Sequence, residues 1–478
     1  MSQTRQISIK KQNVFIGVGL GLALCLGLLS IITESFLVPI IPILVLGLVI
    51  FITFIFKEPL VGLLALLAYC FFMAIPDREL GGLPYGTGVE IILVITWLSV
   101  WYNAHKFDFS ILKNDLVYLT IFWFAISCLQ LVNPAGASPR GWLQEIRSAA
   151  LAPLFIMPLA MLLINTKKRL NLFLVLILAF SLLASLNGLK QLYMGLSPGE
   201  QAFIDDGGAA THLINGKLRI FSFYSDASQF GPAQAYIGVI ALILSVGLKS
   251  RVKKIILIGL ALISFQGMLV SGTRSAFFTL AVGVMVAILL SKNLRALIIG
   301  GGISLLGFIF LKFTYIGNTN YHIYRLRTAL EPQQDASFNL RLINQLKLRD
   351  YLASRPFGGG LGVTGHWGME YNTDKYLSTI APDSYWVKVW AMYGIVGLIF
   401  FFGMWMYILG KCGAMVWKVE DRNLKVKLIA LIAGAWGIFV CSYGNEVMNA
   451  MPSLVILQIS LGAIYVMCKN YKTLNKEA

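Results

Sequence analysis

Three arginines lie in polar segments of an otherwise apolar chain, and their residue type could bind an anion. Arg274 lies in the break Ser271–Ser275, while Arg219 and Arg341 lie in two longer polar segments. A guanidinium group binds phosphate or carboxylate oxygens through parallel N–H donors. Any one of these arginines has a simpler explanation, since an arginine at a helix end extends to the membrane interface. Three of them in breaks rich in Gly and Ser together predict a bound polyanion.

Asp383 is the candidate for a second chemical role, because it stands directly before an apolar run that begins at Ser384. A carboxylate beside a reacting hydroxyl group can accept its proton. The alternative is that Asp383 caps the helix that follows it. The residues leave both interpretations open.

No spacing typical of metal ligands accompanies these residues. The four histidines are scattered, and the adjacent Asp205 and Asp206 precede Gly207 and Gly208, which is typical of a solvated turn. We therefore predict a site without metal and without a cofactor.

The elements that must position these residues are membrane helices. Of the 478 residues, 57% are hydrophobic and only 13% are charged, whereas about 25% are charged in soluble proteins. The net charge of +17 is explained by basic loops on the cytoplasmic side of a membrane protein. We therefore expect no nucleic-acid partner.

Apolar runs of about 20 residues, the length that one helix needs to cross the hydrocarbon, recur about fourteen times. Merging the least distinct runs lowers the number to about twelve or thirteen, so the predicted fold is an all-α polytopic membrane protein with about 12–14 transmembrane helices. The runs lie near 13–33, 36–56, 59–75, 88–102, 115–132, 145–164, 170–189, 230–248, 255–270, 275–290, 296–312, 384–409, 428–443 and 453–468.

Basic residues distinguish the two sides of this bundle. Loops on one side carry groups such as Lys167–Arg169 and Lys249–Lys254, whereas the short loops on the other side are nearly bare of them. The positive-inside rule then predicts that both termini are cytoplasmic. The polar segments 195–229 and 313–383 become outer loops of a single membrane domain, residues 1–478.

The larger outer loop contains a predicted helix over Ser337–Leu352. Its Arg341, Gln345 and Arg349 recur every fourth residue and form one polar stripe. The segment Pro356–Gly362, with four glycines, ends the helix. A cationic stripe on such a helix is expected to face a ligand or another part of the chain.

Three motifs, in this order along the chain, resemble the O-antigen polymerase and ligase superfamily (Wzy/WaaL-like). They are Ser271–Ser275, then Arg341 followed by Pro356–Gly362, then Asp383-Ser-Tyr followed by Tyr393–Gly397. The resemblance covers roughly residues 215 to 410, and the order and spacing of the motifs are more specific than any one of them.

The resemblance implies a metal-independent, inverting glycosyltransferase with a GT-C-like bundle in the bacterial cytoplasmic (inner) membrane. Its implied partners are a glycan donor linked to undecaprenyl pyrophosphate, a glycan acceptor and membrane lipid. Arg219, Arg274 and Arg341 match the basic positions of the family, which implies that they bind the pyrophosphate. Arg274 and Asp383 are then the expected catalytic residues, one stabilising the leaving group and the other acting as base.

The chain departs from the ligases at one position. They carry a His-Asn pair where this sequence has Pro382-Asp383. The difference favours a polymerase of O-antigen, capsule or exopolysaccharide repeat units, for which a chain-length regulator is a candidate partner. The alternative within the family is an O-antigen ligase that transfers glycan to lipid A-core or to protein.

A transporter or flippase of lipid-linked oligosaccharides is the alternative from another class. Such proteins show internal repeats and ionisable residues near the middle of the bilayer. In this sequence the charged residues gather at the outer boundary instead. Glu446 is the nearest exception, and we expect it in an outer turn.

Overall fold

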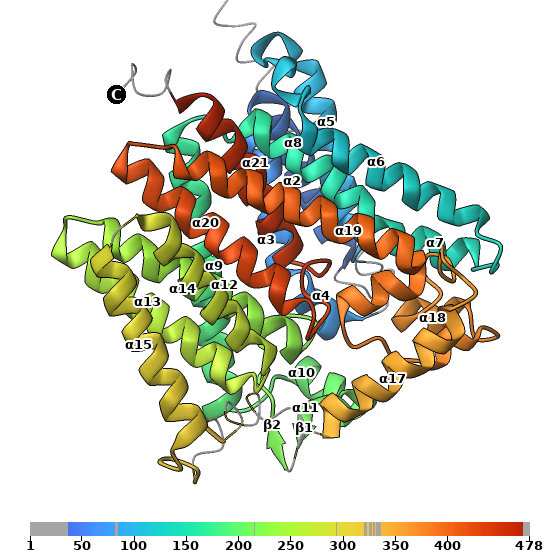
Figure 1. Ribbon diagram of the computed structural model, residues 1–478. Helices are drawn as coiled ribbons and strands as arrows, with labels where there is room; N and C mark the ends of the chain where they lie inside the picture. The colour runs from blue at the N-terminus through green and yellow to red at the C-terminus, as the bar shows by residue number, and fades with distance from the viewer. Residues whose placement is uncertain are drawn as a thin grey trace, which may run out of the picture. The chain divides into compact units, whose positions relative to one another are not determined.

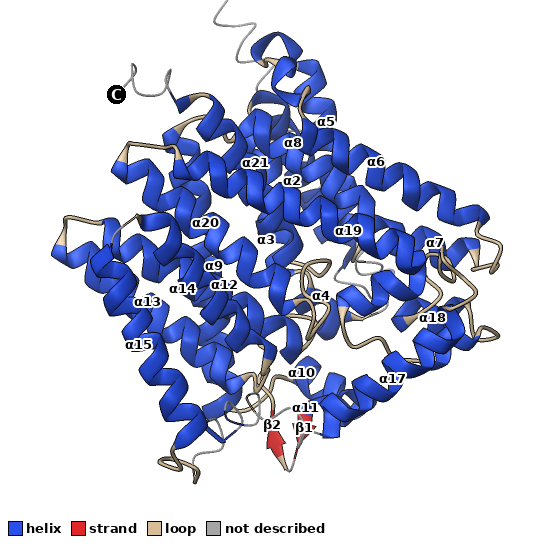
Figure 2. Ribbon diagram, in the orientation of Figure 1, coloured by secondary structure: helices blue, strands red, loops and turns tan. Residues whose placement is uncertain are grey.

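The computed structural model confirms the predicted all-α class. It describes residues 37–81, 85–214, 216–292, 294–319, 323–324, 327, 330 and 336–471. Over these residues helices follow one another through short loops, and a two-stranded antiparallel hairpin is the one sheet (Figures 1 and 2). In that hairpin β1 (Leu213–Ile214) pairs with β2 (Lys217–Leu218).

The helices have the following bounds. In the first half of the chain they are α2 (Leu37–Lys57), α3 (Pro59–Phe72), α4 (Ala74–Leu80), α5 (Thr87–Tyr102), α6 (Asp115–Leu129), α7 (Pro139–Ile146), α8 (Ala152–Leu163), α9 (Lys167–Tyr193), α10 (Pro198–Phe203), α11 (Ala209–His212) and α12 (Ala227–Gly247). In the second half they are α13 (Arg251–Val270), α14 (Ser275–Ser291), α15 (Leu294–Phe313), α17 (Ala336–Leu352), α18 (Gly365–Tyr371), α19 (Tyr385–Trp417), α20 (Arg422–Cys441) and α21 (Ser453–Lys469). Short 3₁₀ turns are η1 (Ala104–Lys106), η2 (Phe109–Leu112), η3 (Gln130–Val132) and η7 (Tyr376–Thr379), and π turns are η4 (Arg147–Leu151) and η5 (Ile204–Gly208).

Several of the described helices are suited to crossing a membrane, so the protein is a multi-pass membrane protein. Seven helical segments are long and apolar enough, and the number becomes eight if α3 and α4, bent by 47°, form one broken span. Every predicted span from 36–56 onward overlaps a helix. The first predicted span, 13–33, lies outside the described residues.

The described chain divides into two compact units. One unit contains the residues up to Gly62 together with Ile95–Ala104, and the other contains Leu63–Val94 and the chain from His105 onward. Within the first unit, the Ser99 hydroxyl donates to the carbonyl oxygen of Ile55 at 2.6 Å, which joins α5 to α2. All residues of the candidate site belong to the second unit.

Two helices, α12 and α21, form the core of the second unit. Residues 229–241 of α12 and 453–467 of α21 are all buried, as expected for helices that are apolar on every side. Helices α13, α14 and α20 pack against α12, and α8 packs against α21 (Figure 1). On α13 the side chains of Ile255 and Leu262 remain exposed, which suits contact with lipid.

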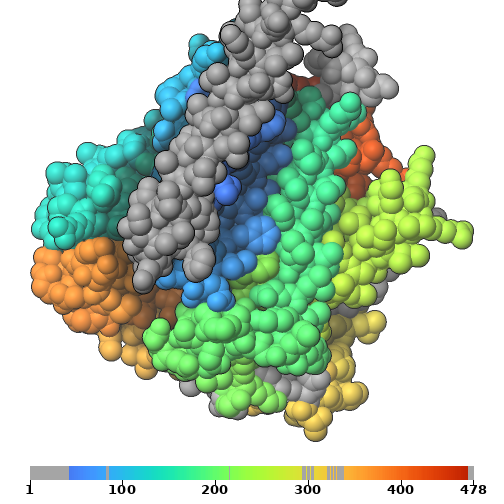
Figure 3. Space-filling view, turned by 180° about the vertical axis from the view of Figure 1, so that it is seen from behind, coloured from blue at the N-terminus to red at the C-terminus, as the bar shows by residue number. Residues whose placement is uncertain are grey.

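The polar segment before α19 folds into helices of its own. The helix predicted over Ser337–Leu352 is present as α17, and α18 follows it. Asn372, at the end of α18, accepts a hydrogen bond from the backbone N–H of Ser138 at 2.6 Å, and α18 packs on α7. In Figure 3 the orange surface of this segment accordingly adjoins the teal surface of α6 and α7.

Candidate active site

Arg219 is fixed against the polar break that carries Arg274. Its Nε donates to the carbonyl oxygen of Ser271 at 3.1 Å, and its Nη2 donates to Thr273 Oγ1 at 3.0 Å. A further bond from Nη1 to the carbonyl oxygen of Thr211 at 3.0 Å holds the guanidinium plane. The structure therefore places the Arg219 side chain on the break that carries Arg274, although 54 residues separate Arg219 from Thr273.

The break itself is shaped by close packing against α12. Gly272 has a φ of +61°, which lets the chain turn between α13 and α14. On α12, a Cβ at Gly231 would lie 2.2 Å from Ser271 Oγ, so only glycine permits this approach. Arg274 is half-buried directly before α14, on an anchored backbone.

The turn between α20 and α21 joins this break to the start of α19. Asn445 Nδ2 donates to Ser275 Oγ at 2.6 Å, next to Arg274. The backbone N–H of Tyr385 donates to the carbonyl oxygen of Ser442 at 2.9 Å. Residues 442–446 therefore lie between the segment of Arg274 and that of Asp383, and Glu446 lies in the bend that follows α20.

A buried lysine lies beside this turn. Lys388 Nζ is 2.9 Å from Glu446 Oε2 and 2.9 Å from Glu145 Oε2, and the side chains of Lys388 and Glu145 are only 6% and 1% exposed. The Glu446 side chain is 28% exposed. Buried charges need close partners to offset desolvation, so one ammonium group between two carboxylates holds α7, α19 and the turn together.

Asp383 is not the capping residue of α19. Ser384 caps the helix, since its hydroxyl accepts a hydrogen bond from the N–H of Val387 at 3.3 Å. Asp383 has a φ of +50°, a backbone conformation uncommon for residues other than glycine. Desolvation of its carboxyl group raises the pKa of Asp383; the nearby Arg341 guanidinium opposes the shift and the Glu446 carboxylate adds to it. Such a carboxylate is a better base near neutral pH than an ordinary aspartate.

Arg341 reaches this site from α17. It is half-buried, and its Nε is a buried donor without a hydrogen-bond partner among the described residues. Asn344, less than one turn later, donates to the carbonyl oxygen of Ala381 at 3.2 Å, which ties α17 to the segment before Asp383. Arg349, the last member of the predicted stripe, is exposed and pairs with Asp350.

The two glycine-rich motifs meet each other. Gly359 N–H and Gly360 N–H donate to the carbonyl oxygens of Ala391 and Met392, at 2.9 and 3.0 Å. Gly394 has a φ of +70°, and a Cβ there would lie 2.1 Å from the Pro356 carbonyl oxygen. These glycines allow the loop after α17 to lie directly on a kink in α19, which positions both segments of the site.

The other polar signals of the sequence have structural explanations. His212 is buried, its Nε2 accepts from the N–H of Ala227 at 3.2 Å, and burial lowers the pKa of its imidazole. Asp205 and Asp206 are exposed in a turn, where Asp205 accepts from Gln201 at 2.9 Å. Among the described residues, no three His, Cys, Asp or Glu side chains form a group that could hold a metal ion.

Comparison with known proteins gives one finding about the family. Residues 258–402 match the family model described as O-Antigen ligase. The match supports membership of the O-antigen polymerase and ligase superfamily. No curated protein matches the chain. The matched segment contains Arg274, Arg341, Asp383 and Lys388, together with both glycine motifs, whereas Arg219 lies outside it.

Sequence reasoning missed Lys388 and Glu145. A signal for both exists, because each is an ionisable residue within or at the start of an apolar run, and such residues mark functional sites in membrane proteins. Their pairing could not be predicted, since it joins helices far apart in the chain.

Proposed function

We propose that the protein is a metal-independent, inverting glycosyltransferase that polymerises oligosaccharide repeat units linked to undecaprenyl pyrophosphate. The reaction takes place on the outer face of the cytoplasmic membrane and yields O-antigen, capsular polysaccharide or exopolysaccharide. The O-antigen ligase match implies lipid-linked glycan substrates in general. The observation that carries the proposal is the placement of Arg219 on the break of Arg274, through Ser271 and Thr273.

In this proposal the arginines bind the pyrophosphate of the donor. When the bond between the anomeric carbon and the pyrophosphate oxygen breaks, its electron pair stays on that oxygen, and negative charge grows there. Donors that are already fixed in place stabilise such charge without rearranging. Arg219 is fixed by three hydrogen bonds, and Arg341 adds a buried donor from α17.

Asp383 is the proposed base. The acceptor hydroxyl oxygen forms the new bond to the anomeric carbon, and its proton passes to the Asp383 carboxylate. The raised pKa of Asp383 supports this role, because a base is most effective when its pKa approaches the working pH. The ion-paired Lys388 and Glu446 hold the neighbouring turn and orient this end of α19.

A ligase is the second candidate, and the description of the matching family favours it. The chemistry at the donor would be the same, and only the acceptor would differ. The sequence Pro382-Asp383 in place of the ligases' His-Asn pair supports the polymerase.

Reconstitution tests the proposal. The purified protein is placed in liposomes with lipid-linked repeat units extracted from bacteria that lack its gene, with and without lipid A-core. A ladder of lengthened glycans with release of undecaprenyl pyrophosphate is expected. Transfer only to lipid A-core would identify a ligase, and movement of the donor across the bilayer without a new glycosidic bond would refute glycosyl transfer.

A further inference from the structure

A polar cavity outside the site described above lies between α4, α9 and α10. It has a volume of about 190 Å³, far more than the roughly 10–15 Å³ that one water requires. The residues that line it include Arg78, Glu79, Asn187, Lys190, Glu200 and Phe223. Nothing in the proposed transfer step uses these side chains.

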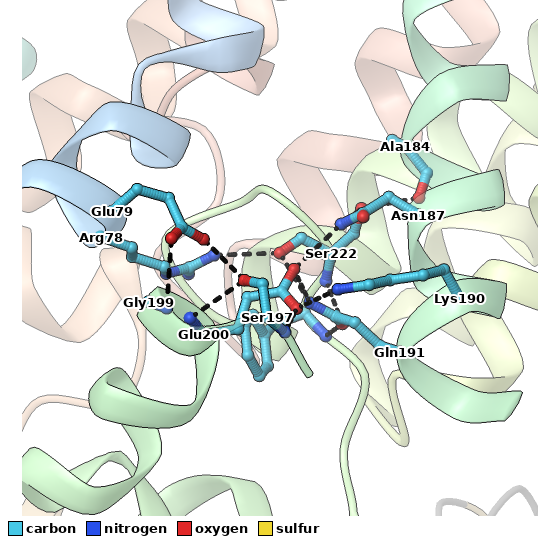
Figure 4. A network of polar contacts seen from close by, with 11 residues as sticks. Arg78, Glu79, Ala184, Asn187, Lys190, Gln191, Ser197, Gly199, Glu200 and Ser222 are labelled. Atoms are coloured by element: carbon cyan, nitrogen blue, oxygen red, sulfur yellow. Dashed lines mark hydrogen bonds and ion pairs between the residues drawn. The ribbon is translucent and has the colours of Figure 1, made fainter. Parts of the chain in front are cut away.

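One wall of the cavity comes from α4. Arg78 Nη1 donates to the carbonyl oxygen of Ser222 at 2.9 Å, and its guanidinium lies 4.6 Å from the centre of the Phe221 ring. Glu79 accepts from Ser197 Oγ at 2.6 Å and from the N–H of Gly199 at 3.2 Å. Figure 4 shows the Glu79 side chain meeting the loop at the start of α10 and the Arg78 guanidinium directed at Ser222.

The opposite wall comes from α9 (Figure 4). Lys190 Nζ is 2.7 Å from Glu200 Oε2, and Gln191 Nε2 donates to Glu200 Oε1 at 2.8 Å. Burial alone would raise the pKa of Glu200, but the hydrogen bonds from Lys190, Ser197 and Gln191 lower it. Glu200 therefore stays ionised and its charge is offset by Lys190.

The charges of the lining cancel while hydrogen-bonding capacity remains. The cations Arg78 and Lys190 are balanced by the carboxylates of Glu79 and Glu200. A free anion therefore gains no net electrostatic attraction from the lining. Lys190 has three N–H donors and uses one on Glu200 among the described residues. Asn187 donates to Glu200 at 3.3 Å and to Ser222 at 3.4 Å through Nδ2, which leaves its carbonyl oxygen as an acceptor.

Such a lining matches a ligand with several hydroxyl groups, because each hydroxyl both donates and accepts. Phe223, 6% exposed, supplies an aromatic wall for the apolar face of a sugar ring. Polar groups in small number on an aromatic wall are typical of small-molecule sites.

The cavity is connected to the arginine site through a short piece of chain. Gln191 Oε1 accepts from the N–H of Ser222 at 2.8 Å, and Arg78 binds the carbonyl oxygen of the same residue. Ser222 follows Arg219 by three residues. Three residues of chain span at most about 11 Å, so the wall of the cavity at Ser222 lies within that distance of the Arg219 backbone.

We infer that the cavity is a binding subsite for an uncharged pyranose ring of the donor glycan. This inference rests on the proposed function, since it takes the glycan as the substrate. Asn187 and Lys190 bind the hydroxyl groups, and Phe223 packs on the ring.

Kinetics of a cavity-filling variant test the subsite. Asn187→Trp places a large ring in the cavity, and Leu186→Trp, at the preceding and 48% exposed position of α9, is the matched control. With extracted lipid-linked repeat units, Asn187→Trp is expected to raise KM at least tenfold and to change kcat less than threefold. The control is expected to retain both constants. If Asn187→Trp fails to fold, Asn187→Ala takes its place, with an expected rise in KM of about three- to tenfold.

A binding measurement separates failure of the subsite from failure of the proposed function. The melting temperature of the wild type is measured with neutral oligosaccharide released from the lipid by mild acid, and with inorganic phosphate. The oligosaccharide is expected to raise the melting temperature of the wild type and of Leu186→Trp, and to leave that of the Asn187 variant unchanged. If the oligosaccharide raises the melting temperature of the wild type but the wild type transfers no glycan, the proposed function is refuted and the subsite stands. The subsite is overturned if the folded Asn187 variant has the KM of the wild type. It is also overturned if inorganic phosphate raises the melting temperature of the wild type and no longer does so in this variant.

Discussion

Replacing Lys388 with Met is predicted to destabilise the protein strongly. Lys388 is 6% exposed and lies 2.9 Å from a carboxylate oxygen of both Glu145 and Glu446. Methionine has a similar length and no charge, so the substitution leaves two carboxylates facing each other. Removal of one partner from a buried ion pair costs about 3–5 kcal/mol.

Most of this cost should come from Glu145, because its side chain is 1% exposed while that of Glu446 is 28% exposed. Lys388→Met with Glu145→Gln should therefore recover part of the lost stability. We expect a coupling energy of about 1–3 kcal/mol between the two positions, as for residues in one network. Lys411→Met is the matched control, because Lys411 and its partner Asp115 are 31% and 34% exposed. An ion pair at the surface contributes about 0–1 kcal/mol, so this less buried pair should contribute less than the buried cluster.

The free energy of unfolding can be measured by titrating the purified variants with a denaturing detergent in mixed micelles. The double-mutant cycle of Lys388 and Glu145 is expected to be strongly non-additive. Additive effects, or a loss in Lys388→Met no larger than that in Lys411→Met, would refute the argument that the buried cluster holds α7, α19 and the turn together.

Three further predictions concern orientation and the site. A reporter active only outside the cytoplasm should be active when fused after about residue 345 and silent after about residue 420; the reverse pattern would contradict an outer site. Because the pKa of Asp383 is raised, the transfer rate should fall as the pH is lowered through a value above the ordinary pKa range of aspartate. Asp383→Asn should lose activity at every pH. If this variant transfers glycan at the wild-type rate, Asp383 is not the base. Arg341→Gln should reduce transfer about ten- to a thousandfold, whereas Arg349→Gln, at a 66% exposed position, should not; equal effects would remove Arg341 from the site.

Most of the fold could be predicted because apolar run length sets the helices. The runs at 230–248 and 453–468 correspond to α12 and α21 within a few residues. The predicted helix is present as α17, and it ends at Leu352 because Pro356 and the glycines that follow cannot continue a helix. Which helices become the core could not be predicted, since apolar runs that face protein and runs that face lipid have the same composition.

The candidate site could be predicted only in part. Arg219, Arg274, Arg341 and Asp383 stand in recognisable polar breaks, but their grouping depends on contacts between distant segments, such as Asn445 with Ser275. The interpretation of Asp383 as a cap is excluded by the hydroxyl of its neighbour, which takes that role. Spacing along the chain carries no information about such contacts.

The proposal that arginines bind the pyrophosphate of the donor is tested most directly by measuring the release of undecaprenyl pyrophosphate by the Arg274→Lys variant. Lysine keeps the positive charge but loses the planar pair of donors that matches a phosphate. In reconstituted membranes with excess EDTA, the wild type should lengthen the glycan and release one undecaprenyl pyrophosphate per new bond. Arg274→Lys should be slower by about ten- to a thousandfold, on the order of 1.4 to 4 kcal/mol, with Arg274→Ala little worse and both variants folded. Near-normal release by Arg274→Lys, or wild-type activity that EDTA abolishes and magnesium restores, would contradict an arginine site for the pyrophosphate.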